Sequence, residues 1–394
     1  MVNLDYNATT PLAPEALEAM MPFLQGHHGN PSSIHGAGRI TRAAIDDARE
    51  RFADLLGARP HELIFTSGGT ESCNLGILGL ARAHAHRGRH VITSPTEHHA
   101  VLHAVEALQH HEGFEVTLLP VDGEGKVTPD DLASAMREDT VLVSVMHANN
   151  ETGVIQSVQE LGAICRERGV FFHTDAVQSF GKLKVLPGEM VADAVSFAAH
   201  KFYGPKGVGA LWLRAGIALT RLAHGGSHEN SRRPGTENVA GIVGMAVAAE
   251  VAERRREPEA SRLGPLRDEL WKGLLEVAPF AIRNGSEGLA NTLNVSFPGY
   301  DGEGLLIALD IEGVGVSSGS ACMVGSMQAS HVLLAMGIDR ATASATVRFS
   351  LGYTTTSKDV SHCLDALARV LQRQTQPGKK SQPISIYENE AVAV

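Results

Sequence analysis

The stretch Ala192–Gly209, ADAVSFAAHKFYGPKGVG, predicts a buried strand that is followed by a lysine and a glycine-rich turn. A lysine placed directly after an apolar run leaves water, and desolvation disfavours its ammonium form. The amine of Lys201 is therefore expected to be a nucleophile near neutral pH, able to form a Schiff base with an aldehyde. An arbitrary lysine past a strand end is more often a surface residue, so other residues must decide between the two interpretations.

A carboxylate lies at the end of a second apolar run. The segment VFFHTDAVQ (170–178) places Asp175 where a predicted strand gives way to a loop, with Gln178 three residues later. Pyridoxal phosphate withdraws electrons only while its ring nitrogen stays protonated, and an aspartate partner holds that proton in place. Asp175 is therefore a candidate partner for a pyridine ring.

A third motif predicts an anion site. The segment ELIFTSGGTESCN (62–74) predicts a strand, a turn at 67–70 and the start of a helix. Two glycines let backbone amides turn toward an anion, and the helix N-terminus adds the positive end of its dipole. Such a turn alone usually only connects two elements. Together, an anion site, an acid for a pyridine nitrogen and a desolvated lysine at three strand ends favour a pyridoxal phosphate enzyme.

The sequence resembles the group I cysteine desulfurases, the NifS/IscS-like enzymes within the class V aminotransferase family of fold-type I pyridoxal phosphate enzymes. The matching motifs run from Asp5 to about Arg373 and are LDYNATTP, TSGGTESCN, TEHHAVL, HANNETG, HTDAVQ, SFAAHKFYGPKG, RRPGTENV, SSGSAC and VRFSLG. The resemblance implies that L-cysteine is the substrate, that L-alanine and a Cys322 persulfide form, and that the sulfur passes to acceptor proteins for iron–sulfur cluster or other sulfur-cofactor biosynthesis. It also implies a homodimer whose partner is an iron–sulfur scaffold or another sulfur acceptor.

The resemblance assigns roles around the cofactor ring. Lys201 corresponds to the lysine that carries pyridoxal 5'-phosphate, Asp175 to the acid on the ring nitrogen, and Gln178 to the hydrogen-bond donor for the ring oxygen. His98 in TEHHAVL matches the histidine that stacks over the ring and moves protons. His99 is the candidate if the register is displaced by one residue.

The resemblance also implies how the phosphate group is held. Its expected partners are the turn with Gly69 and Thr70, the ring of His200, and Thr236 of a second subunit. One residue departs from the family pattern, which has a hydroxyl residue two positions before this histidine, where the chain has Ala198. A hydrogen bond to a charged group contributes about 1.5–3 kcal/mol, so the lost hydroxyl predicts weaker cofactor binding.

Substrate binding needs a cation for the carboxylate of an amino acid, and the planar guanidinium of arginine pairs with a carboxylate through two hydrogen bonds. Arg348 in VRFSLG fits the family position, with Asn150 of HANNETG beside it. An arginine in an alternating strand usually faces solvent, and the motif match reverses that preference.

The remaining requirement is a thiol. Cys322 lies in SSGSACMVGSM, a run of Ser and Gly that cannot pack tightly and is expected to be mobile. The resemblance identifies it as the nucleophile that attacks the substrate sulfur, which only a thiolate can do. The other three cysteines lie on predicted helices among apolar neighbours and are interpreted as small core residues: Cys73, Cys165 and Cys363.

The amino-acid composition bears on the number of domains and on binding to membranes and nucleic acids. A chain of 394 residues with 43% hydrophobic and 20% charged residues is typical of a globular enzyme with two domains. It has no apolar run of about 18 residues and no basic N-terminal segment before an apolar one, so the expected location is the cytoplasm, without a membrane partner. A net charge of −10 without a basic stripe gives no support for nucleic-acid binding.

The cysteine and histidine spacings do not predict a metal centre. The four cysteines lack the Cys-x-x-Cys spacing of zinc ribbons and do not suggest a disulfide framework. His99 and His103 have a spacing that binds metals on helices, but no third ligand motif accompanies them. The sequence therefore predicts no metal site.

The order of apolar runs predicts an α/β fold. Short candidate strands alternate with helical segments between residues 15 and 257, which predicts a mostly parallel sheet flanked by helices. The resemblance implies that this part is a large pyridoxal-phosphate-binding domain whose sheet is of the seven-stranded type. The candidate strands are LIFTS, HVITSP, VTLLPV, VLVSVMHA, VFFHTDA and AVSFAA. Ligands bind at the carboxyl ends of such strands, where every motif above is found.

The rest of the chain predicts a second domain. Residues 1–14 and 258–375 are expected to form a smaller α+β domain that carries the Cys322 loop, and residues 376–394 a flexible tail. An amphipathic helix is predicted over 238–258, because its charge run Arg254–Arg256 suits a helix C-terminus. The boundary between the two domains is placed at the end of this helix.

Two other functions stay open. A class V aminotransferase or a selenocysteine lyase needs no thiol, so Cys322 argues against both. A catalytically silent scaffold for cluster-assembly proteins would not need Lys201, Asp175, His98 and Cys322 together. The sequence does not decide which pathway receives the sulfur, although RRPGTENV resembles the branch dedicated to nitrogenase maturation.

Overall fold

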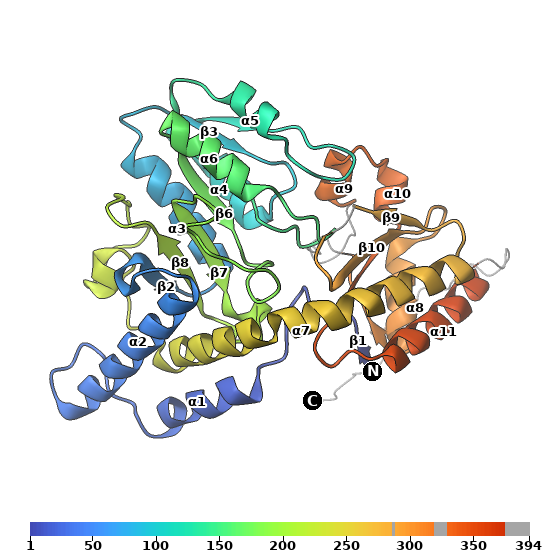
Figure 1. Ribbon diagram of the computed structural model, residues 1–394, viewed down its shortest axis with the longest axis horizontal. Coiled ribbons are helices and arrows are strands. Elements are labelled where there is room, and N and C mark those ends of the chain that lie inside the picture. Colours follow the sequence, from blue (N-terminus) through green and yellow to red (C-terminus); the bar gives the residue numbers. More distant parts are fainter. Residues whose placement is uncertain (286–287, 319–328, 375–394) are drawn as a thin grey trace, which may run out of the picture.

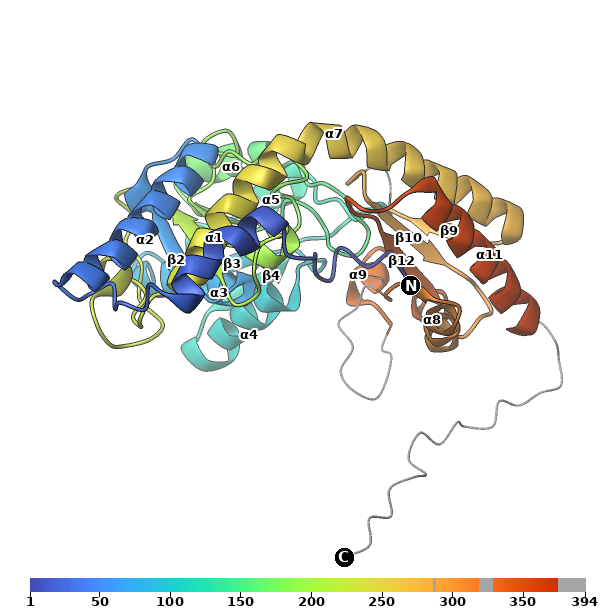
Figure 2. The same cartoon turned by 90° about the horizontal axis from the view of Figure 1, so that it is seen from below.

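The structure, a computed structural model, describes residues 1–285, 288–318 and 329–374 (Figure 1). They form a larger lobe around a seven-stranded sheet and a smaller lobe around a three-stranded sheet. One long helix, α7 (Val239–Val277), runs along both lobes (Figures 1 and 2). Cys322 and the predicted tail lie outside the described residues.

The large sheet is mostly parallel, as predicted. Its order is β2-β8-β7-β6-β5-β3-β4, and every neighbouring pair is parallel except the two pairs that β8 makes, with β2 and β7. Strand β8, GALWL, is absent from the predicted strands because it follows a glycine-rich turn that ends the preceding strand pattern. The bounds are β2 (Leu63–Thr66), β3 (His90–Thr93), β4 (Glu115–Leu118), β5 (Thr140–Ser144), β6 (Phe171–Asp175), β7 (Ala194–Ala198) and β8 (Gly209–Leu213).

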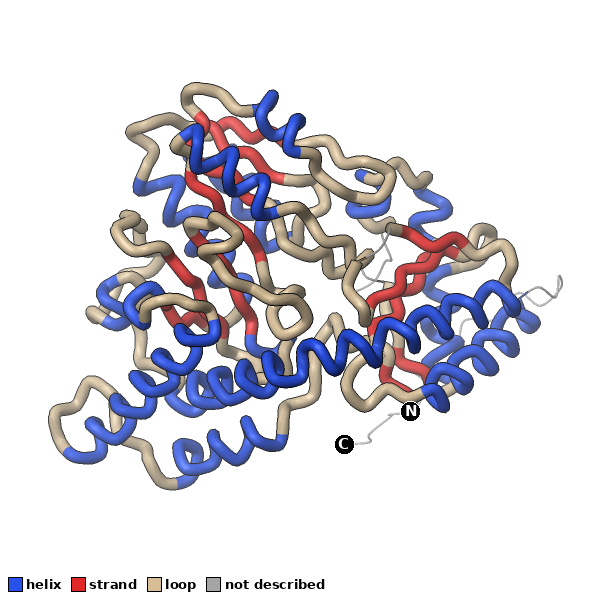
Figure 3. Tube along the Cα trace, viewed as in Figure 1, coloured by secondary structure: helices blue, strands red, loops and turns tan. Residues whose placement is uncertain are grey.

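Helices cover both faces of the large sheet (Figure 3). In β7, Val195 and Phe197 belong to the core under α2, α6 and α7, whereas Ala194 belongs to the core under α3 and α4. Strands that are apolar on both faces are typical of a buried parallel sheet. The bounds of the helical segments here are α1 (Pro14–Gln25), α2 (Gly36–Leu55), η1 (Pro60–Glu62), α3 (Gly69–Ala83), α4 (His99–Glu112), α5 (Pro129–Ala135), α6 (Val158–Arg168), η2 (Ala199–Lys201) and η3 (His228–Ser231).

The smaller lobe has its own apolar core under an antiparallel sheet of order β12-β10-β9. The N-terminal strand β1 pairs in parallel with β11 beside it. The bounds are β1 (Val2–Asn3), β9 (Ile282–Asn284), β10 (Thr292–Ser296), α8 (Gly302–Ile311), β11 (Val314–Gly315), α9 (His331–Ala335), α10 (Arg340–Ser344), β12 (Thr346–Ser350) and α11 (Ser357–Gln374).

Helix α7 does not end at residue 258, so the predicted C-terminus there is wrong. The helix continues through Pro258 and Pro265 to Val277. Each proline removes a helical hydrogen bond and destabilises the helix by about 3 kcal/mol, but the second half buries Leu263, Leu266, Leu270 and Leu274 in the core of the smaller lobe. Burial of these leucines stabilises the helix by more than the two prolines destabilise it.

The first half of α7, up to Ala252, belongs to the core of the larger lobe. The predicted domain division at 257–258 therefore falls within one continuous helix, between the parts that serve the two cores. At 39 residues α7 is long, but charged side chains interrupt it, and no helix in the described ranges has an apolar stretch that could cross a membrane.

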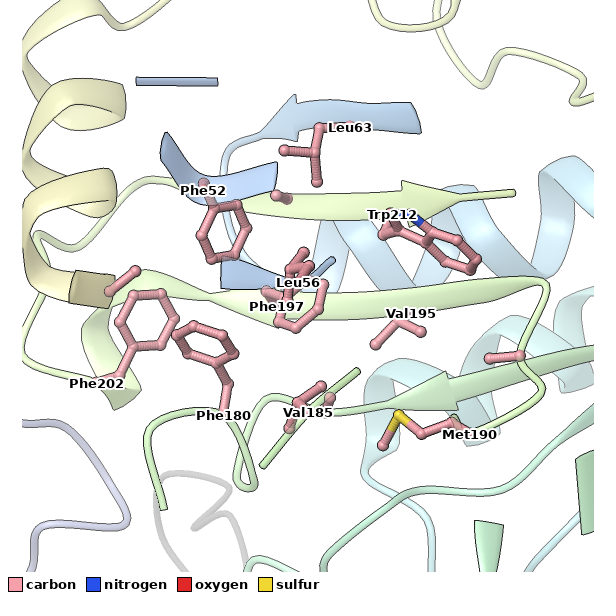
Figure 4. Close-up of a cluster of buried hydrophobic side chains, with 14 of the residues drawn as sticks. Phe52, Leu56, Leu63, Phe180, Val185, Met190, Val195, Phe197, Phe202 and Trp212 are labelled. Carbon is pink, nitrogen blue, oxygen red and sulfur yellow. The ribbon is translucent and has the colours of Figure 1, made fainter. Parts of the chain in front are cut away.

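Four phenylalanines, Phe52, Phe180, Phe197 and Phe202, pack together in the core of the larger lobe (Figure 4). The ring of Phe52 in α2 makes edge contacts with Phe180 and Phe197, at 5.4 Å between centroids in each case. Phe180 in turn contacts Phe202 at 4.8 Å. Since Phe197 and Phe202 flank Lys201 in the chain, this cluster fixes the backbone that carries the lysine.

Replacing Phe52 by alanine is expected to lower the free energy of unfolding by about 3–5 kcal/mol, because it removes a fully buried ring and leaves a cavity. The measurement is chemical denaturation followed by circular dichroism. Phe280→Ala is the matched control, since Phe280 is 43% exposed, and its effect should be much smaller. Equal effects of the two substitutions would contradict the role given to the cluster.

Candidate active site

A cavity of about 410 Å³ opens at the carboxyl ends of strands β6 and β7, between the two lobes. This is where parallel α/β sheets bind ligands. The cavity brings together all but two of the predicted site residues: Gly69, Thr70, His98, Asn150, Asp175, Gln178, His200, Lys201 and Arg348. The exceptions are Thr236, which is exposed and does not line the cavity, and Cys322, which lies outside the described residues.

Lys201 projects from the short helix η2, one turn beyond β7. Its Nζ donates hydrogen bonds to the main-chain oxygens of Asn7, at 2.7 Å, and Ala8, at 2.8 Å. Burial lowers the pKa of this amine to about 8, and the positive charge of Arg348 adds to the effect. The amine is therefore held in place by neutral acceptors that leave it able to lose its proton near neutral pH.

Asp175 is the last residue of β6 and is buried. Its Oδ1 accepts a hydrogen bond from the backbone N–H of Val177 at 2.8 Å, and its Oδ2 accepts one from the thiol of Cys73 at 3.5 Å. Burial raises the pKa of the carboxyl above its usual range. A thiol is a weak donor, so Oδ2 keeps the capacity to accept a stronger N–H donor, as the pyridine nitrogen of the expected cofactor would supply.

The turn before α3 has the shape of an anion cradle. Gly68 has a φ of 154°, and a Cβ on Gly69 would lie 2.9 Å from Cγ2 of Val177 and 3.2 Å from Cβ of Ala198. Glycine is thus needed at 69 so that the backbone can approach the end of β7. The residues around this turn fit a phosphate group through the amides at the start of a helix.

Two basic side chains lie beside the turn. His200 and Lys206 line a hollow that adjoins the cavity, together with Ser67 and Thr70. The Nδ1 atom of His200 is 3.2 Å from Oγ1 of Thr9, and burial lowers the pKa of the ring to about 4. His200 therefore offers a neutral N–H to an anion, while Lys206, which the sequence analysis did not assign, supplies a positive charge.

His98 caps helix α4. Its Nδ1 accepts a hydrogen bond from the backbone N–H of Ala100 at 3.1 Å, so the neutral ring carries its proton on Nε2. Burial lowers its pKa, against the opposing charge of Asp175. His98 and His99 both line the cavity.

Arg348 lies in β12 of the smaller lobe and is 3% exposed. Its Nη2 donates to the Asp5 carboxylate and its Nη1 to the main-chain oxygen of Asn150, at 2.8 Å each. Its Nε is buried and has no hydrogen-bond partner among the residues that the structure describes. A buried guanidinium with one unused N–H is suited to bind the carboxylate of an amino acid.

Asn7 lines the cavity and Lys182 contacts Asn7 from outside the lining, and neither was assigned from the sequence. Asn7 belongs to the LDYNATTP motif, which marks the family but whose letters do not tell which atoms meet the site. Its main-chain oxygen accepts from both Lys201 and Gln178. Cys73 is buried in the core as predicted and also contacts Asp175, which the helical pattern could not indicate.

Three histidine rings lie close to one another, and two of them, those of His99 and His331, line the cavity. The ring centroid of His99 lies 5.0 Å from that of His103 and 4.6 Å from that of His331. Within the part of the chain that the structure describes, no three or more His, Cys, Asp or Glu side chains are arranged to share a metal ion.

The lowered pKa of Lys201 predicts how the cofactor-free chain reacts with pyridoxal phosphate. Only the neutral amine attacks an aldehyde, so the rate should rise about tenfold per pH unit below the pKa of about 8 and level off above it. Stopped-flow absorbance measures the rate, with Lys201→Ala as the control that should not react. A rate that keeps rising to near pH 10, as for an ordinary lysine, would show that the amine is solvated.

Comparison with known proteins agrees with this geometry. The aminotransferase class-V family model matches residues 2–363. The chain is 50% identical over 394 residues to the cysteine desulfurase IscS of Dictyoglomus turgidum, covering 99% of this chain and 97% of the relative. It is 46% identical to the cysteine desulfurase IscS of Methanosarcina thermophila, covering 94% and 92% respectively.

Solved structures give the same assignment. A NifS-like protein superposes with a TM-score of 0.89 at 39% identity, covering 94% of this chain and 99% of that chain. SspA in complex with cysteine superposes with a TM-score of 0.79 at 37% identity, covering 89% and 99%. The chain therefore belongs to the aminotransferase class-V family and, within it, to the cysteine desulfurases.

Proposed function

We propose that this chain is a pyridoxal-phosphate-dependent L-cysteine desulfurase that uses the cavity between its lobes as the active site. The observation that carries the proposal is the convergence on one cavity of the Lys201 amine, the Asp175 carboxyl and the Arg348 guanidinium. Asp175 and Arg348 are buried and Lys201 is half-buried. Oδ2 of Asp175 accepts only from a thiol, and Nε of Arg348 has no partner among the described residues. Relatives of nearly full length that are named cysteine desulfurases support the same activity.

The residues of the chain divide the work as follows. Arg348 would bind the substrate carboxylate, because it is a buried cation from the smaller lobe that lines the cavity. Lys201 would carry the cofactor and move a proton, because its amine is neutral in part near pH 7. Asp175 would accept the N–H of the pyridine ring. When bound there, pyridoxal phosphate would supply the electron sink for breaking bonds at the substrate carbon.

The sulfur acceptor in this proposal is Cys322. Its thiolate attacks the substrate sulfur, so a sulfur–sulfur bond forms as the carbon–sulfur bond of cysteine breaks. The electron pair of the broken bond stays on the carbon, which takes up a proton, and the carbon skeleton leaves as L-alanine. An aminotransferase or selenocysteine lyase would not need this thiol, and a catalytically silent scaffold would not need the buried amine. The persulfide then passes to an iron–sulfur scaffold or another acceptor protein.

The proposal extends to a homodimer in the cytoplasm. Thr236 of the same chain does not line the cavity, so its predicted contact with the phosphate requires a second copy. Support comes from large apolar side chains exposed on and between α1 and α2: Leu17, Leu24, Ile34 and Ile40.

The test is Cys322→Ala in the cofactor-loaded enzyme. We expect this variant to keep the visible absorbance of the cofactor and to lose sulfide release from L-cysteine, since only the sulfur acceptor is removed. Sulfide is measured colorimetrically with a thiol reductant present. Cys165→Ala is the control, because Cys165 is a buried core thiol far from the cavity lining. Retained sulfide release by Cys322→Ala would refute the mechanism, and a colourless wild-type protein would refute the cofactor.

Ala198→Ser is expected to tighten cofactor binding. Ala198 ends β7, is buried, and lines the cavity next to Gly69, so a serine hydroxyl there would reach the same anion cradle. One added hydrogen bond to a charged group should lower the dissociation constant by roughly one to two orders of magnitude. Titration of cofactor-free protein with pyridoxal phosphate measures the change. No tightening would mean that other groups already satisfy the phosphate.

A further inference from the structure

A second lysine lies directly behind Gln178. Lys182 follows it by one turn, and its Nζ donates to Oε1 of Gln178 at 2.8 Å and to Oδ1 of Asn7 at 3.0 Å. Lys182 lines a second cavity, of about 40 Å³, and Lys201 lines both this cavity and the active-site cavity.

The contacts of Asn7 show what Lys182 is connected to. Asn7 is 1% exposed, and its main-chain oxygen accepts from Lys201 and Gln178 at 2.7 and 2.8 Å. Its side-chain oxygen accepts from Lys182 and from Nδ2 of Asn291, both at 3.0 Å. A single buried residue therefore connects both lysines, Gln178 and the smaller lobe.

These contacts determine the orientation of the Gln178 amide. Its oxygen is held by Lys182, and one of its two N–H groups is held by the main-chain oxygen of Asn7. The reversed orientation would place the Gln178 oxygen against the Asn7 oxygen, and the amide N–H groups against the amine. The second N–H of Gln178 is therefore left to face the active-site cavity, which this residue lines.

The hydrogen-bond count of Lys182 matches a neutral amine, which has two N–H donors, both used here. Burial, with the charges of Lys201 and Arg348, lowers the pKa of Lys182 well below its usual range. The acidic groups that act on the neighbouring Lys201 are Asp5 and Asp175. A neutral Lys182 can hold Gln178 and Asn7 without adding a further cation beside Lys201.

We propose that Lys182 is a positioning residue of the active site, whose amine fixes Gln178 and Asn7 so that one Gln178 N–H is always presented to the ring oxygen of the bound cofactor. The inference rests on the proposed function, because it concerns the same cofactor site. Lys182 itself does not touch the active-site cavity. Its effect is therefore expected in the titration of the cofactor chromophore rather than in the loss of an attacking group.

The test is a double-mutant cycle between Lys182→Met and Gln178→Met, read from the visible absorbance of the cofactor-loaded enzyme as a function of pH. A donor on the ring oxygen stabilises the anion that remains when the chromophore loses its proton. Loss of the donor should therefore raise the pKa of the chromophore, by about one unit for one charge-assisted hydrogen bond. Lys182→Met is expected to raise it in the wild-type background and to have little further effect when Gln178 is already Met.

Lys184→Met is the matched control, since Lys184 lies two residues away, is exposed and pairs only with the Glu189 carboxylate among the contacts of its amine in the described chain. Thermal unfolding of the cofactor-free variants separates a folding defect from a positioning effect. If Lys182→Met does not fold, Lys182→Gln, which keeps an N–H donor on a shorter side chain, takes its place in the same cycle, with a smaller shift expected.

Two outcomes would overturn the inference: a chromophore pKa that moves no more in Lys182→Met than in Lys184→Met, or the same movement with and without Gln178. Both require that the cofactor binds and colours the protein. A wild-type chain that binds no pyridoxal phosphate would instead contradict the proposed function, so the two failures are distinguishable.

Discussion

The pair of hydrogen bonds from the Lys201 amine to the main-chain oxygens of Asn7 and Ala8 is the interaction on which the site depends. The N-terminal segment starts in the core of the smaller lobe, at Leu4, and reaches the core of the larger lobe at Ala13. Between these points it passes over the amine. The same few residues that join the lobes therefore also desolvate and orient the nucleophile.

The ionisable groups around the cavity are mostly shielded from water or uncharged near pH 7. Asp175 is buried, His98 and His200 have lowered pKa values and are neutral near pH 7, and Arg348 is almost fully enclosed. Low local dielectric strengthens each interaction with a bound anion or cation and penalises any that stays unpaired. The site is thus prepared for a charged cofactor and an amino-acid substrate before either arrives.

Sequence patterns predicted the parts of this arrangement that have a local cause. Lys201 and Asp175 follow apolar strands, and the Gly68-Gly69 turn precedes a helix, so their places at the sheet edge follow from short-range rules. The role of Asn7 depends on contacts with residues far along the chain, which no local pattern contains. Helix α7 was predicted too short because the charge run Arg254–Arg256 is a local signal of a helix C-terminus, whereas the leucine stripe that extends the helix packs in the core of the smaller lobe. Strand β8 is fixed by its two antiparallel neighbours more than by its five residues.

The placement of Lys201 has a consequence for the order of folding. The lysine lies in the connection between β7 and β8, whose ends are paired at Ala198 and Gly209, so its backbone is set by contacts that are close in sequence. Its partner Asn7 is 194 positions away, and closing so long a loop is entropically slow. Loop-closure entropy therefore predicts that the backbone of Lys201 is set before the N-terminal segment covers its amine.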